Sequence, residues 1–379
     1  MKILSFSLDN SILDKTSLLA KSTVEYGNLV DQYIVLAPNR KKIKVELAQN
    51  VIAYGVSGFN KAFILFSIFL LANKIIKKEK INVITVQDPF EVALVGWLLT
   101  KINKINLNIQ EHGDFFSEKY WQKESMRNYF RYYLGKFLIK RADSVRVVSK
   151  KIKKTLIKIG VDDKKIITVP VYTEVSYSEE ENTGRKMFKE IYKKEFLFLT
   201  MGRMVKQKNI LLLIRSFYEM NDNIKKKSVL KIIGKGKEKK NLINLVKKLK
   251  LTNQVEFLDW TKYEDVWDQF WMAGAFVLPS NYEGWGRVII EAAATKLPII
   301  MTRVGCADEV IKNNESGIII DIGDQEALTS AMEELVNNKE KTDKMGEKAQ
   351  EAIKKLPNKI ETLKLYKKSW EIAYENYHK

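Results

Sequence analysis

The feature of this sequence that most constrains its fold is a repeated alternation of short β-rich runs with amphipathic helical patterns. In the first half, strands are predicted at residues 2–7, 32–36, 82–87, 106–110, 144–148 and 166–169, with helices at 17–26, 59–78 and 126–141. In the second half, strands are predicted at 195–201, 229–233, 254–258, 275–278, 298–301 and 317–321, with later helices at 327–336 and 341–355. Such alternation predicts parallel sheets with helices on both faces.

The alternation is interrupted once, and this break predicts two domains. Residues 171–193 are polar, carry an acidic run and lack periodicity, as is typical of a linker. A chain of 379 residues also fits two domains better than one. We expect an N-terminal domain over 1–175, a C-terminal domain over 190–358 and a last helix within 359–379.

Charge and composition restrict the possible partners and compartment. The net charge is +19, and residues 119–158 hold 13 Lys/Arg residues against Glu124 and Asp143, with aromatic residues interleaved. This stretch either meets anionic lipid headgroups, an anionic acceptor or nucleic acid, or it is a solvated lysine-rich surface whose aromatics are core residues. The single cysteine, Cys306, and the short apolar run 62–72 predict a cytosolic protein without disulfides or membrane spans.

The most informative local motif is a pair of glutamates separated by a glycine-rich turn. The turn joins a predicted buried strand to a predicted helix that starts near Arg287, and Glu283 and Glu291 lie on either side of it. In α/β folds, this junction binds phosphorylated ligands. Carboxylates accept hydrogen bonds from sugar or ribose hydroxyls, so the motif predicts a nucleotide-sugar site.

The string from Pro279 to Ala292 resembles the E-x7-E signature of the retaining GT4 glycosyltransferases, which have the GT-B fold. That resemblance implies two Rossmann-like domains facing each other across a cleft, with a C-terminal helix that crosses back to the first domain. It places Glu283 beside the donor sugar and Glu291 on the nucleotide ribose. The donor-binding loop between them then contains Gly284, Trp285, Gly286, Arg287 and Val288.

Three further segments follow the same resemblance. Residues 200–209 resemble the family's G-R-L-x-x-x-K-G segment, so Gly202, Arg203 and Lys208 are expected at the departing diphosphate, whose developing charge fixed cations stabilise. Gly234 matches the next glycine turn near the nucleotide. Trp260 lies where the family often contacts the base, where it either stacks on the base or is simply buried. In the first domain, His112 either matches the family's histidine that contacts the donor sugar or is a structural loop residue.

The sequence also departs from the family pattern at one loop. Residues 9–15 contain no glycine after the first predicted strand, so we assign no site there. The sequence shows no motif that would predict a metal site, and the expected cofactor is none beyond the nucleotide-sugar co-substrate.

This resemblance implies a retaining hexosyltransferase. It would use a UDP- or GDP-sugar and a hydroxyl acceptor, as in the synthesis of cell-envelope polysaccharide, capsular polysaccharide or lipid-linked glycans. Its expected location is the cytoplasm, with peripheral contact at an anionic membrane. Two alternatives remain open: a nucleotide-sugar epimerase with the same fold, and a non-catalytic protein that binds sugar or nucleic acid.

Overall fold

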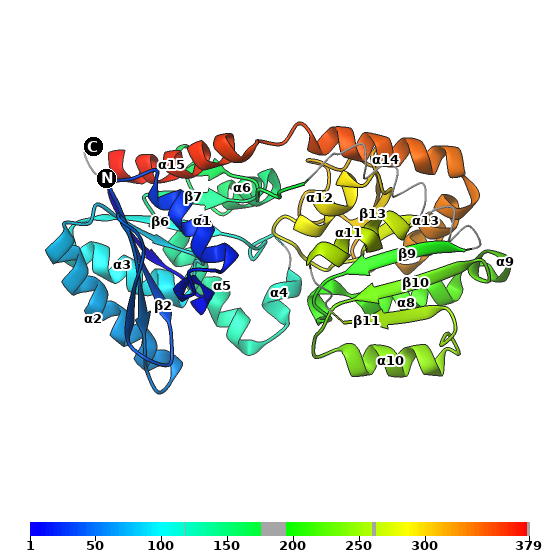
Figure 1. Cartoon of the computed structure of the whole chain (residues 1–379), viewed down its shortest axis with the longest axis horizontal. Coiled ribbons are helices and arrows are strands. Elements are labelled where there is room, and N and C mark those ends of the chain that lie inside the picture. Colours follow the sequence, from blue (N-terminus) through cyan, green and yellow to red (C-terminus); the bar gives the residue numbers. More distant parts are fainter. Residues whose placement is uncertain (118, 176–194, 260–262, 377–379) are drawn as a thin grey trace. The chain divides into compact units, whose positions relative to one another are not determined.

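The computed structural model describes residues 1–117, 119–175, 195–259 and 263–376, which form two compact units (Figure 1). Unit 1 contains Met1–Tyr172 together with Pro357–Lys379, and unit 2 contains Thr173–Leu356. Most of the predicted linker lies outside the described residues.

Unit 1 is built on an eight-stranded sheet of order β3-β4-β2-β1-β5-β6-β7-β8. All its neighbouring strands are parallel except β3 and β4, which pair antiparallel. Its strands are β1 (Lys2–Phe6), β2 (Gln32–Pro38), β3 (Ile43–Ala48), β4 (Val51–Val56), β5 (Val83–Val86), β6 (Asn106–Glu111), β7 (Ser144–Val147) and β8 (Ile166–Thr168). Its helices are η1 (Asn10–Leu13), α1 (Leu18–Gly27), α2 (Lys61–Glu79), α3 (Glu91–Asn103), α4 (Lys119–Lys123), α5 (Met126–Ile139), α6 (Lys150–Lys158), η2 (Asp163–Lys165) and α15 (Lys359–Glu375).

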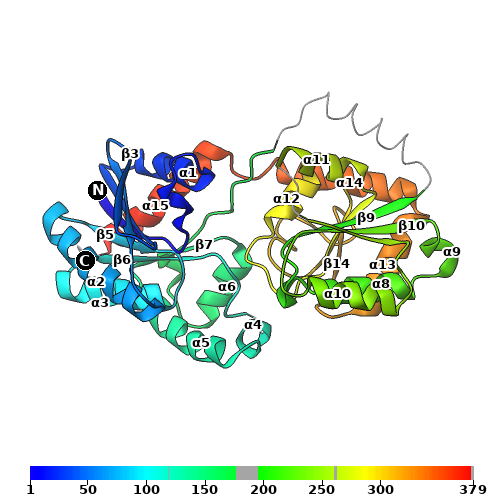
Figure 2. The ribbon, with the colours of Figure 1, turned by 60° about the horizontal axis from the view of Figure 1, so that its bottom comes forward.

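The last helix, α15, belongs to the core of unit 1. Its capping box at Asn358 and Glu361 fixes where it begins, because side chain and backbone satisfy each other's free amides. Trp370 is fully buried against Tyr33 of β2, and Tyr366 stacks on Tyr26 of α1. Figure 2 shows α1 and α15 together in unit 1. The C-terminal segment is therefore a structural part of the unit that contains the N-terminus.

Unit 2 is built on a six-stranded, wholly parallel sheet of order β11-β10-β9-β12-β13-β14. Its strands are β9 (Phe196–Met201), β10 (Ser228–Ile233), β11 (Val255–Leu258), β12 (Ala275–Leu278), β13 (Ile299–Thr302) and β14 (Ile318–Ile320). Its helices are η3 (Lys206–Lys208), α8 (Ile210–Glu219), α9 (Asp222–Lys225), α10 (Lys239–Lys248), α11 (Tyr263–Met272), α12 (Arg287–Ala294), α13 (Gln325–Asn337) and α14 (Lys339–Ile353).

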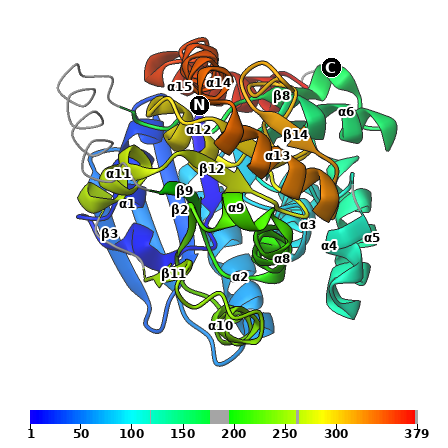
Figure 3. The same ribbon diagram turned by 90° about the vertical axis from the view of Figure 1, so that its right-hand side faces the viewer.

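The core of unit 2 explains why its strands read as continuous apolar runs. Central strands such as β12 are buried along their whole length, because helices cover both faces of a parallel sheet. On one face, α8 packs against α13 and α10 (Figure 3), and Phe217 and Met332 are fully buried in the cluster between sheet and helices.

The sequence prediction of this α/β architecture is confirmed, with one omission. All twelve predicted strands are present within two residues of their expected limits, and α12 begins at Arg287 as predicted. The prediction missed the hairpin of β3 and β4, which adds an antiparallel edge to unit 1. The edge strand β3 is largely exposed and rich in charge, so it lacks the apolar run that marks the other strands.

No helix among the described residues is long and apolar enough to cross a membrane.

Candidate donor site

The predicted donor-binding loop lies at the carboxyl end of β12 and leads directly into α12. Gly286 is the N-cap of α12 and has a φ of +87°, a conformation that favours glycine. Gly286 provides no side-chain cap, and the Ile289 amide donates to the Gly286 carbonyl at 2.8 Å, so in the described part of the chain the open amides at this terminus are those of Arg287 and Val288. Gly305, after β13, packs under the same loop, and a Cβ there would lie 2.5 Å from the Trp285 carbonyl oxygen. The loop is therefore held by close backbone packing.

Glu283 and Lys208 form an ion pair inside this site. They lie 75 positions apart in the sequence, and they meet because β9 and β12 are neighbours in the sheet. Both side chains are largely buried, with 10% and 15% of their surface exposed. Ser280 donates a further hydrogen bond of 2.8 Å to the same Glu283 oxygen, Oε1. The structure thus unites the acid predicted for the sugar with a cation predicted for the diphosphate.

A set of hydrogen bonds joins the loop after β9 to the loop after β12. The backbone N–H of Asn281 donates to the backbone carbonyl of Gln207 at 2.8 Å, and the Gln207 side chain donates to the backbone carbonyl of Tyr282 at 3.0 Å. The Asn209 side-chain NH₂ donates to the Asn281 side-chain oxygen at 3.1 Å. These bonds hold Lys208 and Glu283 in register, which a preorganised site requires.

Glu291 lies one helical turn beyond Arg287, and the two form an ion pair of 3.0 Å. Burial raises the pKa of Glu291 above its ordinary value, although the Arg287 guanidinium works in the opposite direction. Arg287 itself is half exposed. A partly desolvated carboxylate with one exposed partner retains acceptor capacity for hydroxyl groups.

The remaining predicted residues of unit 2 have different surroundings. Gly202 and Gly234 directly follow β9 and β10, with φ values of +157° and +142°. Arg203 is exposed, whereas Lys208 is engaged with Glu283. Gly284 and Trp285 are buried, and Val288 is half-buried. The predicted base contact Trp260 lies outside the described residues.

In unit 1, His112 follows β6 directly and keeps exposed side-chain surface. The pKa of His112 lies below its ordinary value, first because surrounding protein atoms disfavour the charged imidazolium and second because of the Arg146 guanidinium. The neutral imidazole can both donate and accept a hydrogen bond. Asp114, two residues later, is buried and lies 3.6 Å from Lys151.

A buried polar network links β5, β6 and β7 beneath α15. Arg146 donates to the Gln110 side chain at 2.9 Å, and its guanidinium stacks 3.9 Å from the Tyr366 ring centroid. At the other end, the Ser144 hydroxyl donates to the Ser369 carbonyl at 2.7 Å. These contacts give the segment around Arg146 a structural role in unit 1.

Comparison with known proteins accounts for nearly the whole chain. Residues 184–352 match the family model described as glycosyl transferases group 1, and residues 28–171 match that of glycosyltransferase family 4. The solved structure of HepE from Anabaena, in complex with UDP and glucose, superposes with a TM-score of 0.73 at 16% identity over 98% of both chains. The chain is a glycosyltransferase of the GT-B fold. The prediction of a glycosyltransferase and its α/β, GT-B fold class are therefore confirmed, whereas the retaining mechanism stays a prediction.

Two relatives illustrate the range of this family. An uncharacterised glycosyltransferase of Methanocaldococcus jannaschii is 28% identical over 311 residues, which cover 81% of each chain. The UDP-Gal:α-D-GlcNAc-diphosphoundecaprenol α-1,3-galactosyltransferase of Escherichia coli is 24% identical over 273 residues, which cover 70% of this chain and 69% of that relative.

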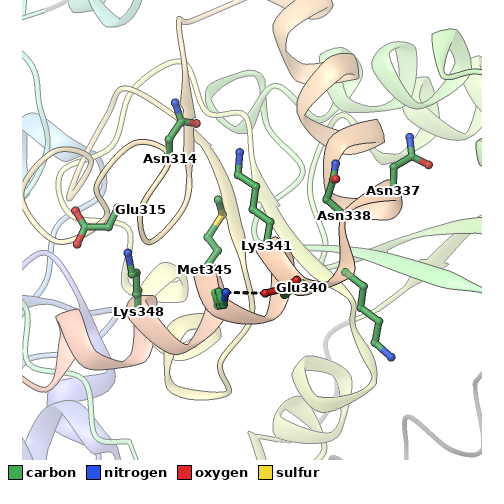
Figure 4. A pocket seen from close by; sticks show the side chains of 10 residues that line it. Asn314, Glu315, Asn337, Asn338, Glu340, Lys341, Met345 and Lys348 are labelled. Carbon is green, nitrogen blue, oxygen red and sulfur yellow. Dashed lines mark hydrogen bonds and ion pairs between the residues drawn. The ribbon is translucent and has the colours of Figure 1, made fainter.

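An open hollow of about 570 Å³ lies elsewhere on unit 2 of the glycosyltransferase (Figure 4). It is lined by the residues before β14 and by the junction of α13 and α14, with Lys341, Lys348 and the Glu340–Lys344 ion pair on its wall. These segments lie at the amino ends of the strands, whereas the donor-site residues follow the carboxyl ends. None of the predicted site residues lines this hollow.

Sequence reasoning missed several residues that shape the donor site. Ser280 lies within the motif, but its hydrogen bond to Glu283 was not predicted. Gln207 and Asn281 also lie within the matched segments, but the hydrogen bonds that they form between the two loops were not predicted. A serine or amide at the end of a buried strand is a weak signal by itself, because such residues commonly satisfy their own backbone.

Among the described residues, no cluster of histidine, cysteine or acidic side chains could hold a metal ion.

Proposed function

We propose that this glycosyltransferase is a retaining enzyme that transfers a hexose from a UDP- or GDP-sugar to a hydroxyl group. The observation that carries the proposal is the buried Lys208–Glu283 pair beside the uncapped N-terminus of α12. A helix N-terminus and a lysine favour a diphosphate, and a carboxylate favours sugar hydroxyls. HepE, whose structure was solved in complex with UDP and glucose, has the same fold as this chain, and this likeness supports the same assignment.

In the proposed reaction, the acceptor oxygen bonds to the anomeric carbon on the face from which the diphosphate departs. The bond between that carbon and the phosphate oxygen breaks, and the acceptor proton passes to the departing phosphate. Lys208 and Arg203 stabilise the charge that develops on the diphosphate, so the reaction needs no metal ion. Glu283 and His112 orient the sugar, and Glu291 binds the ribose.

The Lys208–Glu283 pair implies an exchange of partners when the donor binds. A diphosphate that approaches Lys208 competes with the Glu283 carboxylate, which is then released to accept hydrogen bonds from sugar hydroxyls. Pairing the two charges in the absence of donor avoids an uncompensated buried charge. The same two residues therefore serve both the empty and the occupied site.

For the acceptor, we propose a lipid-linked glycan of a cell-envelope or capsular pathway, used at the cytoplasmic face of a membrane. The E. coli relative is by name a galactosyltransferase acting on a diphosphoundecaprenol-linked sugar. This likeness supports a membrane-bound acceptor without identifying its sugar.

The test is nucleoside diphosphate release from a panel of UDP-, GDP- and ADP-sugars, with lipid extracts that contain undecaprenol-linked glycans as the acceptor source. We expect turnover with one donor class, and a loss of roughly 10²–10³-fold in Glu283→Gln. The matched control, Glu315→Gln, changes a carboxylate in the hollow of Figure 4 and should retain full activity.

Two results would reject the proposal. One is binding of nucleotide-sugars without any transfer, together with interconversion of the donor sugar, which would identify an epimerase. The other is full activity in Glu283→Gln, which would move the reaction to a different site.

A further inference from the structure

Three helices of unit 1 present an unusual outer surface, here called the α2–α3–α5 face. Helix α3 packs between α2 and α5 (Figure 2). Large hydrophobic side chains are exposed on all three helices and at Phe59, two residues before α2 begins. Each is more than 40% exposed: Phe59, Phe63, Phe66, Leu70, Leu98, Ile102, Met126, Tyr129, Phe130, Tyr133 and Phe137. Contiguous apolar patches of this kind mark interaction sites on soluble domains.

The exposed residues follow helical spacing, so they form continuous stripes rather than scattered positions. On α5, Met126, Phe130, Tyr133 and Phe137 succeed one another at intervals of four, three and four residues. On α2, Phe63, Phe66 and Leu70 succeed one another at intervals of three and four residues. The opposite sides of both helices carry the residues that pack inward, such as Ile68 and Leu138. The two helices thus have a second apolar stripe that the fold does not use.

The charges on these helices are almost all positive. Helices α2, α3 and α5 contain eight Lys/Arg residues against only Glu79 and Glu91. Glu91 is already engaged with Arg131, Arg127 and Lys61. On α2 the apolar stripe continues into exposed Lys74 and Lys77. The α2–α3–α5 face therefore combines exposed apolar side chains with surrounding positive charge.

We propose that the α2–α3–α5 face is a docking surface for an anionic lipid bilayer. Aromatic and aliphatic side chains would enter the boundary between headgroups and acyl chains, and lysines and arginines would contact anionic headgroups. A second copy of the chain is a poorer occupant, because pairing the face with itself would bring cations against cations. Nucleic acid is also less suitable, since a charged phosphate backbone would leave the aliphatic side chains of Leu70, Leu98 and Ile102 without an apolar partner, whereas acyl chains bury them.

This proposal differs from the one that the sequence suggested. The basic aromatic stretch 119–158 includes α6, whose exposed residues are mainly lysines, with Ile157 as its only exposed large hydrophobic residue. The structure instead joins α5 to α2 and α3, whose exposed phenylalanines and leucines lie outside that stretch. It also answers one open alternative in part: Trp121 of that stretch is a core residue, whereas Tyr129, Phe130, Tyr133 and Phe137 are exposed.

The test measures co-sedimentation of the full chain with vesicles that contain no glycan acceptor, so its outcome is independent of the proposed transfer reaction. Vesicles of phosphatidylcholine alone are compared with vesicles in which phosphatidylglycerol replaces part of it. We expect at least ~10-fold stronger binding to the anionic vesicles, reduced by added salt. The triple variant Phe66→Ser, Leu70→Ser and Phe130→Ser should lose roughly 10- to 100-fold of that binding.

A matched control changes three exposed apolar residues outside the face. Leu18→Ser, Leu211→Ser and Ile360→Ser remove side chains of similar exposure from α1, α8 and α15, and should bind vesicles like the wild type. A charge variant, Lys74→Glu, Lys77→Glu and Lys101→Glu, should abolish the preference for anionic vesicles while leaving the apolar stripes intact.

The proposal is overturned if the serine variant binds as well as the wild type, or if neither vesicle binds the wild type. It is equally overturned if single-stranded DNA binds the wild type and vesicles do not. A dimer in solution that the serine variant converts to a monomer would identify the face as a self-association interface instead.

Discussion

Glu111 precedes the predicted donor-sugar contact His112 and is the most unusual side chain of unit 1. It is 1% exposed, and neither of its carboxylate oxygens has a hydrogen-bond partner of ordinary geometry. Burial, and then the nearby Asp114 carboxylate, raise the pKa of Glu111 well above its ordinary value of 4.5. The folded protein therefore retains a proton that the unfolded chain releases.

This difference makes the stability of unit 1 depend on pH. Because the folded state holds the extra proton, the free energy of unfolding should fall as pH rises above 4.5. Glu111→Gln removes the titrating group. Its free energy of unfolding should therefore increase relative to that of the wild type by up to about 1.4 kcal/mol for each pH unit above 4.5. Urea unfolding at several pH values between 5 and 8 measures this difference. As a control, Glu371→Gln changes a carboxylate that is 45% exposed, and its plot of unfolding free energy against pH should run parallel to that of the wild type. A Glu111→Gln plot that also runs parallel to the wild type would contradict this prediction.

At the same scale, sequence reasoning named residue types correctly but could not predict their pairing. The motif predicted acids for the sugar and cations for the diphosphate, yet it gave no reason for Lys208 to bond to Glu283. That contact depends on the adjacency of β9 and β12, and strand order is a property of the whole sheet. The assignment of donor roles to these residues stays a prediction.

At the scale of elements, helix α15 shows how a terminal segment becomes part of a core. Trp370 is fully buried and contacts Tyr33 and Tyr366. The apolar spacing of this helix was visible in the sequence. The hydrogen bond from Ser144 to its backbone could not be predicted, because a buried hydroxyl is indistinguishable from an exposed one in the sequence.

Truncating Trp370 should destabilise unit 1 specifically. Trp370→Ala should lower the free energy of unfolding by about 3–5 kcal/mol, through lost burial and the cavity left behind. Tyr374→Ala, on the same helix but 38% exposed, should cost less than about 1 kcal/mol. Native-state hydrogen exchange can separate the two units. Equal destabilisation by both variants, or a loss of protection confined to unit 2, would show that α15 does not support the unit 1 core.

The omitted β3–β4 hairpin marks the limit of pattern reading for elements. β4 alternates buried and half-buried residues, and β3 is mostly exposed. The edge strand β3 has one partner and little burial, so its sequence carries a weak signal. β4 pairs with both β2 and β3, and the prediction overlooked its apolar run. The other strands, including the edge strands β8, β11 and β14, were predicted within two residues.

At the scale of the whole molecule, the chain distributes its chemistry between two units. Unit 2 carries the glycine turns, Lys208, Glu283 and Glu291 at one edge of a parallel sheet. Unit 1 carries His112 and the α2–α3–α5 face. Sequence alternation and one motif predicted the fold class, because both follow from local patterns. The exposed stripes of unit 1 could not be predicted, since an outward stripe and an inward stripe have the same periodicity.

The most direct test of the central claim is hydrogen–deuterium exchange of the full chain with and without UDP, read at peptide resolution. The account predicts that UDP slows exchange in peptides covering residues 202–209, 234–239 and 283–291, because the ligand occupies the amides at the carboxyl edge of the unit 2 sheet. GDP is measured in parallel, so that the nucleotide that protects these peptides identifies the donor class. Protection confined to the hollow around Lys341 and Lys348, or no protection by either nucleotide at saturating concentration, would contradict the account.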